Sequence, residues 1–183
     1  MRETFLNVAY LDYDTLSEGY DELYGEEQRA KHLYAVNRVG ETVERVCDAG
    51  CGTALLLETI RAKLGPVEYV GIDTAANMLA KAASRADAYT HLVHADAQHM
   101  PFREKAFSHL FCLTVIHHLN PQQFIQEAQR TTTTKIIISQ HKRLSPRLTD
   151  IHVEESETAD EIITIPVFLW EDSGGVGEDS LSR

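Results

Sequence analysis

The sequence lacks the features that define several common protein classes. Its 183 residues include only three cysteines, Cys47, Cys51 and Cys112, a sparse and odd-numbered set that argues against a disulfide framework. No apolar run approaches the roughly 20 residues that a membrane-spanning helix needs. The opening residues, MRETFLNVAYLDYD, lack the long apolar core of a secretion signal. We therefore expect a cytoplasmic protein with no membrane span.

Charge is distributed unevenly along the chain, whose formal net charge is −11. Residues 1–30 carry eight acids and two bases, and residues 150–183 carry ten acids and one base. Residues 31–149 instead hold fourteen bases and ten acids. The centre is therefore mildly basic between acidic ends, and it has no basic stripe of the kind that binds nucleic acid.

Short apolar runs alternate with helical patterns through most of the chain. We expect five strands, RVCDAG, EYVGID, THLVHAD, FSHLFCLTVI and KIIIS, and helices over 26–39, 53–64, 75–86 and 121–130. Two final strands are expected over 150–157 and 161–170. This alternation predicts an α/β, doubly wound, mostly parallel sheet with helices on both faces.

The two ends of the chain carry weaker signals. Thr15 and Glu18 have the spacing of a capping box at the head of an N-terminal helical region. Gly19 and Gly25 are expected to break that region before the helix over 26–39, which Gly40 ends. The polar, glycine-rich and acidic residues 171–183 predict a flexible tail.

Three successive expected strands end in an aspartate: Asp48, Asp73 and Asp96. A single aspartate at such a place often caps the next helix or supports a turn. In parallel sheets, however, ligands bind beyond the carboxyl ends of the strands. Three carboxylates at that edge favour a ligand site.

The segment VCDAGCGTA, residues 46–54, indicates which ligand. It is not the dinucleotide pattern G-x-G-x-x-G, because Leu55 stands at the last glycine position, and it lacks the Lys and Ser/Thr of a P-loop. Asp48 would repel a pyrophosphate but attract an ammonium or sulfonium cation. Asp73 is placed to accept both hydroxyls of a ribose, and Asp96 to accept from the amine of an adenine. The pattern favours a nucleoside with a cationic amino-acid arm. Because Cys47 and Cys51 have no second pair, we expect no metal site.

Four segments carry a resemblance to a known family. VCDAGCGTA, VGIDTAANMLAKA, VHADAQHMPF and FSHLFCLTVIHHL follow one another at the spacing of four family motifs. On these motifs the chain resembles the class I S-adenosylmethionine-dependent methyltransferases, especially the small branch similar to ubiquinone/menaquinone-biosynthesis C-methyltransferases. The resemblance covers about residues 10–140, with Ala54 in place of the usual third glycine. It implies a Rossmann-like, seven-stranded sheet with a C-terminal antiparallel hairpin.

The resemblance also implies roles for the methionine and ribose parts of the cofactor site. Gly50 and Gly52 would bring backbone against the methionine part of S-adenosylmethionine, and Asp48 would organise that turn. Asp73 would bind the ribose hydroxyls. Leu113 would lie near the transferred methyl group, which leaves S-adenosylhomocysteine as the product.

On the adenine side, the resemblance assigns four further residues. Thr74 and Met78 would line the ring, Asp96 would accept from its amino group, and the Ala97 backbone would lie beside it.

The aromatic N-terminal segment resembles the family's lid. Tyr13, Tyr20 or Tyr24 would then close over the cofactor, although ordinary amphipathic packing explains these tyrosines equally well. The resulting domain boundaries are a helical lid over 1–40, a cofactor-binding methyltransferase domain over 41–170 and an acidic tail over 171–183.

Two departures from the family concern the segments beside the fifth strand. RTTTTK stands where the family commonly has a Pro-Gly-Gly turn. After the strand, only QHKRLSPRL, residues 140–148, stands in place of a long substrate-covering insertion. The reduced cover predicts an acceptor that is large, or a second chain, either a copy of this one or a partner subunit, that completes the site.

Methyl transfer from a sulfonium is an in-line displacement that depends on alignment and on exclusion of water. A general base is needed only if the acceptor must lose a proton. His117 is the candidate base, although the family commonly has a packing histidine here. The basic residues His141, Lys142, Arg143 and Arg147 form either a solvated loop or an anchor for an anionic acceptor group.

Three functions are consistent with these residues. The first is an active methyltransferase with an unidentified acceptor. The second is a catalytically inactive S-adenosylmethionine-binding module that serves a partner protein. The third is another nucleotide binder, such as an NAD enzyme, which the glycine loop disfavours.

Overall fold

The structure is a computed structural model that describes residues 20–40, 42–146, 148, 153–154 and 160–167. The capping box of Thr15 and Glu18, Tyr13, Arg147 and the tail over 171–183 lie outside these residues. The predictions made for them therefore stay predictions.

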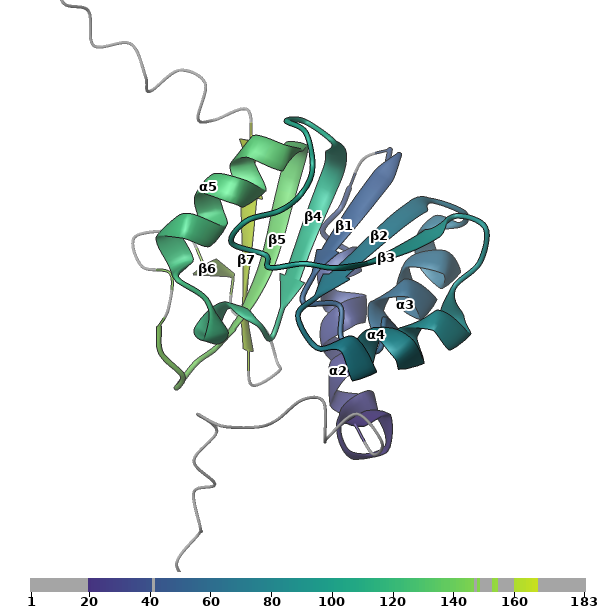
Figure 1. Ribbon diagram of the computed structural model, residues 1–183. Coiled ribbons are helices and arrows are strands. Elements are labelled where there is room, and N and C mark those ends of the chain that lie inside the picture. Colours follow the sequence, from purple (N-terminus) through teal and green to yellow (C-terminus); the bar gives the residue numbers. More distant parts are fainter. Residues whose placement is uncertain (1–19, 41, 147, 149–152, 155–159, 168–183) are drawn as a thin grey trace, which may run out of the picture.

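A seven-stranded sheet forms the centre of the fold, in the order β3-β2-β1-β4-β5-β7-β6 (Figure 1). The first five strands pair in parallel, and β7 pairs antiparallel with β5 and with β6. The mostly parallel sheet with a C-terminal antiparallel hairpin is confirmed. The strands are β1 (Arg45–Ala49), β2 (Glu68–Asp73), β3 (Thr90–His94), β4 (Phe107–Leu113), β5 (Thr132–His141), β6 (Val153–Glu154) and β7 (Asp160–Pro166).

Strand order reverses between β1 and β4. The chain runs outward from β1 through β2 to β3, and then returns to place β4 on the other side of β1. Such a switch point leaves a crevice beyond the carboxyl ends of the two central strands, because their outgoing connections diverge. The glycine loop begins at this point, directly after Ala49.

Helices cover both faces of the sheet, as predicted. The helix α5 (Pro121–Thr131) lies over one face, and α2 (Tyr20–Val36), α3 (Leu55–Leu64) and α4 (Ala76–Ala82) lie on the other (Figure 1). Asn120 caps α5 by accepting hydrogen bonds from the amides of Gln122 and Gln123, and Pro121 occupies the first turn, where its missing N–H costs nothing.

Alternate strand residues supply the two apolar cores. On β4, Leu110 and Cys112 face the α5 side, where they share a core with Phe124. Phe111, between them, faces the other side and packs with Leu57 of α3. Complete burial of one large apolar side chain stabilises the fold by about 1.5–3 kcal/mol, so this alternation fixes which face each strand presents.

Two local predictions about the N-terminal helix are wrong. Gly25 does not break it, because α2 runs without interruption from Tyr20 to Val36. A glycine inside a helix costs about 1 kcal/mol relative to alanine, and burial of this face outweighs that cost, since Gly25 lies on it. The helix also ends at Val36 rather than Val39.

The expected helix over 75–86 is shorter in the structure, since α4 ends at Ala82 and a 3-10 turn, η3 (Ala83–Arg85), follows. The segment RTTTTK forms no separate turn: α5 continues to Thr131 and β5 begins at Thr132. Threonines favour extended backbone, because their branched side chains fit a pleated sheet.

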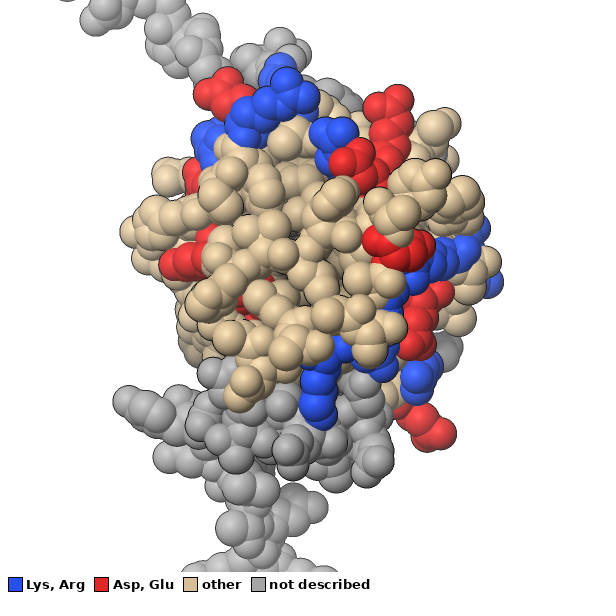
Figure 2. Space-filling view, turned by 45° about the vertical axis from the view of Figure 1, so that its right-hand side comes forward, with Lys and Arg blue, Asp and Glu red and all other residues tan. Residues whose placement is uncertain are grey.

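Charged side chains lie mostly around the rim of the face shown in Figure 2, and its centre is largely uncharged. Within the described residues, no helix is long and apolar enough to cross a membrane.

Candidate functional site

The backbone amides of the glycine loop donate hydrogen bonds to the end of β2. The amides of Gly50 and Cys51 donate to the carbonyl of Ile72, at 2.8 and 3.0 Å. The amide of Gly52 donates to Asp73 Oδ2 at 2.8 Å. A phosphate-binding loop must present its amides to the anion. These three are already engaged, so the loop is poorly suited to a pyrophosphate.

The two glycines of the loop have different reasons to be glycine. Gly50 has φ +79°, and a Cβ there would lie 2.5 Å from Cγ2 of Val115, so the packing leaves no room for a side chain. Gly52 has φ +54°, and a Cβ there would meet no atom within 4 Å in the described structure. Gly50 therefore serves packing, whereas Gly52 borders open space that a ligand can enter closely.

Asp48 lies at the switch point, close to the end of β1, and is 3% exposed. Its Oδ2 accepts a hydrogen bond from the hydroxyl of Tyr69. Burial raises the pKa of Asp48 to about 7, against the lowering effect of Tyr69, and the nearby Asp73 adds to the rise. Near neutral pH the carboxyl group of Asp48 is therefore only partly ionised, and a cation bound beside it would favour the ionised form.

Asp73 organises the loop. Its Oδ2 accepts from the amide of Gly52 and its Oδ1 from the amide of Ala75, each at 2.8 Å. The sequence analysis missed this role. A carboxylate has about four acceptor positions, so the partly exposed Asp73 keeps capacity for further donors. Its predicted role at the ribose stays a prediction.

The predicted adenine side lies at the ends of β2 and β3. Asp96 is 41% exposed and its Oδ1 accepts from the amide of Gln98 at 2.8 Å. Burial raises the pKa of Asp96, but hydrogen bonds from Gln98 and His99 outweigh that effect and lower it overall. Asp96 is therefore an ionised acceptor at neutral pH.

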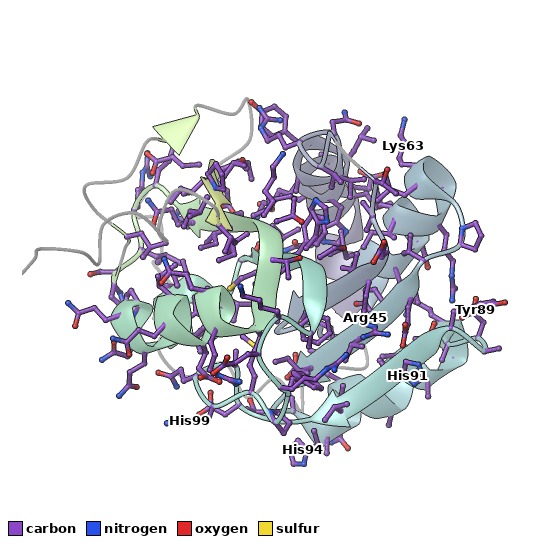
Figure 3. The ribbon with its side chains drawn as sticks, turned by 90° about the horizontal axis from the view of Figure 1, so that it is seen from above. Arg45, Lys63, Tyr89, His91, His94 and His99 are labelled. Atoms are coloured by element: carbon purple, nitrogen blue, oxygen red, sulfur yellow. The ribbon has the colours of Figure 1, made fainter. Side chains whose placement is uncertain are left out.

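The other residues predicted for the adenine side differ in exposure. Met78 and Ala97 are buried, at 2% and 6% exposed, and can supply only apolar surface and backbone. Thr74 is exposed, and its carbonyl lies 2.8 Å from Nε2 of His94. Figure 3 labels His94.

A cavity of about 50 Å³ lies between the loop and α2. It brings together four predicted residues, Asp48, Gly50, Gly52 and Leu113, with two from α2 that the sequence analysis missed, Gln28 and His32. The cavity is lined by Gln28, His32, Asp48, Gly50, Cys51, Gly52, Thr53, Leu55, Leu56 and Leu113.

A signal in the sequence could have found the two α2 residues. The buried face of α2 and the turn after it comprises Gly25, Gln28, Lys31, His32, Ala35, Val36 and Val39. This is the spacing of one helix face. The apolar members lie toward the C-terminal end, and the face becomes polar as it reaches the site.

A buried polar network joins α2 to the ends of β4, β5 and β7. The ammonium of Lys31 lies 3.3 Å from Oδ2 of Asp160, with the two side chains 2% and 0% exposed. Ser139 donates to the same oxygen at 2.9 Å. Thr114 has φ +64°, unusual for a β-branched residue, and its amide donates to Ser139 Oγ at 2.7 Å. These contacts fix α2 against the sheet edge at which the cavity opens.

His117 lies in the 3-10 turn η4 (Ile116–His118) after β4 and is half-buried. Its Nδ1 is buried without a hydrogen-bond partner among the described residues. Burial lowers its pKa to about 4, with a smaller lowering effect from His118 and an opposing one from Asp160. His117 is therefore neutral at physiological pH but a weaker base than free imidazole. It is not among the residues that line the cavity.

The structure does not decide two further predictions. Tyr24 lies within α2, but its side chain, like that of Tyr20, is outside the described part of the chain. His141 is the last residue of β5. Lys142 and Arg143 follow it, and both are exposed. Whether they form a solvated loop or an anchor stays open.

Comparison with known proteins relates this site to one protein-family model. Residues 46–135 match the protein-family model described as a methyltransferase domain, and the match includes the glycine loop and all three strand-end aspartates. Over this segment, just under half of the chain, the protein is similar to methyltransferase domains. No curated protein sequence matches the chain.

Solved structures share the fold of this chain. One is Haemonchus contortus phosphoethanolamine N-methyltransferase 2 with phosphomonomethylethanolamine and S-adenosylhomocysteine, at TM-score 0.63 and 22% identity over 75% of this chain and 35% of that one. A structure of the Haloferax volcanii Trm112 methyltransferase activator in complex with a methyltransferase matches at TM-score 0.62 and 21% identity. The match covers 70% of this chain and 59% of that one. The [4+2]-cyclase SpnF matches at TM-score 0.56 and 21% identity, over 64% of this chain and 46% of that one.

The chain thus covers less than two thirds of the length of each of these structures, and identities this low show the fold alone. The similarity to the ubiquinone/menaquinone branch stays a prediction.

Proposed function

We propose that the protein is an S-adenosylmethionine-dependent methyltransferase that transfers the sulfonium methyl group by in-line displacement to an acceptor not yet identified. The observation that carries this proposal is the chemistry of the glycine loop. Its engaged amides disfavour a pyrophosphate, while buried Asp48 beside it favours a cation. A dinucleotide needs loop amides that are free to bind its pyrophosphate. A sulfonium nucleoside with an ammonium group needs no such amides and is attracted by the carboxylate of Asp48.

The proposed cofactor lies along the carboxyl ends of β1, β2 and β3. Asp48, Gly50, Gly52 and Leu113 would surround the methionine part, since these four line one cavity. Asp73 would accept the ribose hydroxyls with its remaining lone pairs.

The adenine would rest on Met78 and Ala97, with Asp96 as the acceptor for its amino group and Thr74 at the rim. Tyr24 is retained in the proposal as a member of the lid.

The chain's own contribution to the chemistry is to orient the reactants and to exclude water. The cavity holds the methionine arm against the loop, which fixes the direction in which the methyl group points. His117 is proposed as the group that accepts a proton from the acceptor, if one must be lost. Its lowered pKa makes it a weak base, so an acceptor atom that already has a lone pair, or that loses its proton readily, suits it best.

The acceptor side of the site is proposed to be completed by segments 1–40 as a lid and by a large acceptor, a second copy or a partner subunit. The Haloferax volcanii neighbour was solved in complex with an activator, which supports a partner for this chain as well. We also propose that the protein is cytoplasmic. The acidic residues 171–183 are proposed to form a flexible tail.

The alternative function is a binding module that holds S-adenosylmethionine without transferring its methyl group. The resemblance of the fold to a [4+2]-cyclase favours keeping this alternative, because the same architecture there belongs to a protein with a different named reaction.

Incubation of the purified chain with S-adenosylmethionine that carries a radiolabelled methyl group, in cell extract, tests the proposal. We expect label to move into a protein, nucleic-acid or small-molecule fraction, and Asp73→Ala to reduce the transfer at low cofactor concentration. Cofactor binding without any labelled product would favour the binding module. Deletion of residues 1–25 tests the lid: lower cofactor affinity in a folded protein supports it, and unchanged affinity contradicts it.

A further inference from the structure

Thr114, directly after β4, has a backbone conformation that its side chain disfavours. Its φ of +64° is left-handed, and among the described residues Ala54 and Lys105 are the other non-glycine residues with positive φ. Thr114 alone of these three is β-branched, which makes its conformation the most strained. Such an outlier persists only where the surrounding contacts hold it, and these positions cluster at binding sites.

Leu113 and Val115, the two neighbours of Thr114, contact the cavity and the glycine loop. Leu113 is one of the residues that line the cavity. Val115 packs so closely against Gly50, another lining residue, that a Cβ on that glycine would lie 2.5 Å from Cγ2 of Val115. Because φ and ψ of one residue set the direction of the chain on either side of it, the conformation of Thr114 decides how Leu113 and Val115 meet the site.

A buried serine of β5 holds this conformation. Oγ of Ser139 accepts a hydrogen bond from the amide of Thr114 at 2.7 Å and donates its own hydrogen to Oδ2 of Asp160 at 2.9 Å. The hydroxyl of Thr114 makes a longer contact, 3.4 Å, with the same carboxylate oxygen. Ser139 and Asp160 are both 0% exposed. Since the hydroxyl hydrogen of Ser139 is directed at Asp160, its oxygen is left as the acceptor for the amide of Thr114.

We infer that Ser139 is a positioning residue of the cofactor site, acting through the backbone of Thr114. It keeps Thr114 left-handed, and this turn sets Leu113 against the methionine arm and Val115 against Gly50. The inference rests on the proposed function, which places the methionine arm there. Without the Ser139 hydroxyl, Thr114 would relax toward right-handed or extended backbone. A ligand would then bind only the fraction of molecules that still have the turn, so its apparent affinity would fall.

A double-mutant cycle tests the inference, with calorimetric titration of S-adenosylhomocysteine into the full chain. Ser139→Ala is made in the wild type and in Thr114→Gly, because glycine adopts left-handed backbone without steric cost. In the wild-type background, Ser139→Ala should weaken binding by about 5- to 30-fold, which is the preference of an L-residue for right-handed backbone. In the Thr114→Gly background, the same change should weaken binding by about twofold or less.

Melting curves of the same variants separate positioning of the site from support of the fold. Ser139→Ala should lower the melting temperature in both backgrounds, because the amide at position 114 loses its partner in each. Ser108→Ala is the matched control. Oγ of Ser108 also accepts from backbone amides, those of Glu44 and Arg45 at 3.2 and 3.3 Å, but near the start of β4. This variant should lower the melting temperature and leave the affinity for S-adenosylhomocysteine unchanged.

Two results would overturn the inference. One is a folded Ser139→Ala variant that binds S-adenosylhomocysteine as tightly as wild type. The other is an equal loss of affinity in both backgrounds, which would mean that Ser139 does not act through the backbone of Thr114. If Ser139→Ala does not fold, Ser139→Cys, whose thiol is a weaker acceptor, replaces it, and the loss should again be larger with Thr114 than with glycine. Wild type that does not bind S-adenosylhomocysteine would refute the proposed function, and the inference with it.

Discussion

The hydroxyl of Tyr69 on β2 donates a hydrogen bond to the carboxyl group of Asp48 on the neighbouring strand β1. Both side chains are buried, at 0% and 3% exposed. Burial, first of all, raises the pKa of Tyr69 well above its ordinary value, so the phenol stays a donor. The pair lies under the glycine loop, where an ionised Asp48 is costly for folding but useful for a cationic ligand.

Replacement of Asp48 by Asn should stabilise the empty protein at alkaline pH. The folded-state pKa of Asp48 is raised from 3.8 to about 7, so its favourable contribution is complete below about pH 4 and is lost as pH rises through about 7. Asn cannot ionise, and the gain at pH 8 should reach the order of 4 kcal/mol, from 1.36 kcal/mol for each pKa unit.

Thermal melting of wild type and Asp48→Asn at pH 5 and pH 8 checks this prediction. The difference in melting temperature should be clearly larger at pH 8. An equal difference at both values would mean that Asp48 is already ionised at pH 5.

Cofactor affinity should rise with pH below neutrality. A ligand ammonium binds best beside ionised Asp48, whose population grows as pH approaches about 7. Between pH 5.5 and 7 we expect affinity for S-adenosylhomocysteine to increase by about tenfold. Calorimetry across this range measures it, with Asp48→Asn as the control that should show a nearly flat profile. A steep profile in the variant would assign the effect to another group.

The two loop glycines should respond differently to alanine. Gly50→Ala should impair folding, because its Cβ would lie 2.5 Å from Cγ2 of Val115. The double variant with Val115→Ala should recover much of that stability. Gly52→Ala should fold, at a cost of about 1–2 kcal/mol for left-handed backbone, and bind S-adenosylhomocysteine poorly.

Melting and binding of the three loop variants separate the two roles. Gly52→Ala that binds as well as wild type would show that the open space beside Gly52 is not the ligand's place.

Asp73→Ala should reduce both binding and stability. The loss of an ionised acceptor should weaken S-adenosylhomocysteine binding by about 1.5–3 kcal/mol, and the amides of Gly52 and Ala75 should lose their partner at a stability cost of about 1–3 kcal/mol. Calorimetry and melting measure the two effects. Asp87→Ala, at an exposed carboxylate, is the control. An Asp73 variant with normal affinity would contradict the assignment of the ribose site.

Much of the fold was predictable because the information was local. The strands over 45–49, 68–73 and 107–113 each contain a short run of apolar residues. Asn120, a helix-capping residue, and Pro121 mark the start of α5. The strand-end aspartates and the glycine loop were found for the same reason. The course of α2 was not, because a break at Gly25 is a local expectation that packing overrides.

The missed part of the site depends on contacts between distant residues. Gln28 meets Thr114 across 86 positions, and Lys31 lies against Asp160 from the far end of the chain. A polar residue on a helix face is normally assigned to solvent. Only the position of α2 against the sheet edge shows that Gln28 and His32 face inward.

Calorimetric titration of the wild-type chain with S-adenosylhomocysteine and, separately, with NAD⁺ tests the central claim most directly. The claim is that the loop after β1 accepts a nucleoside with a cationic amino-acid arm and not a pyrophosphate. We predict saturable binding of S-adenosylhomocysteine at one site per chain and no detectable heat from NAD⁺. Binding of NAD⁺, or no binding of S-adenosylhomocysteine by folded protein, would contradict the account.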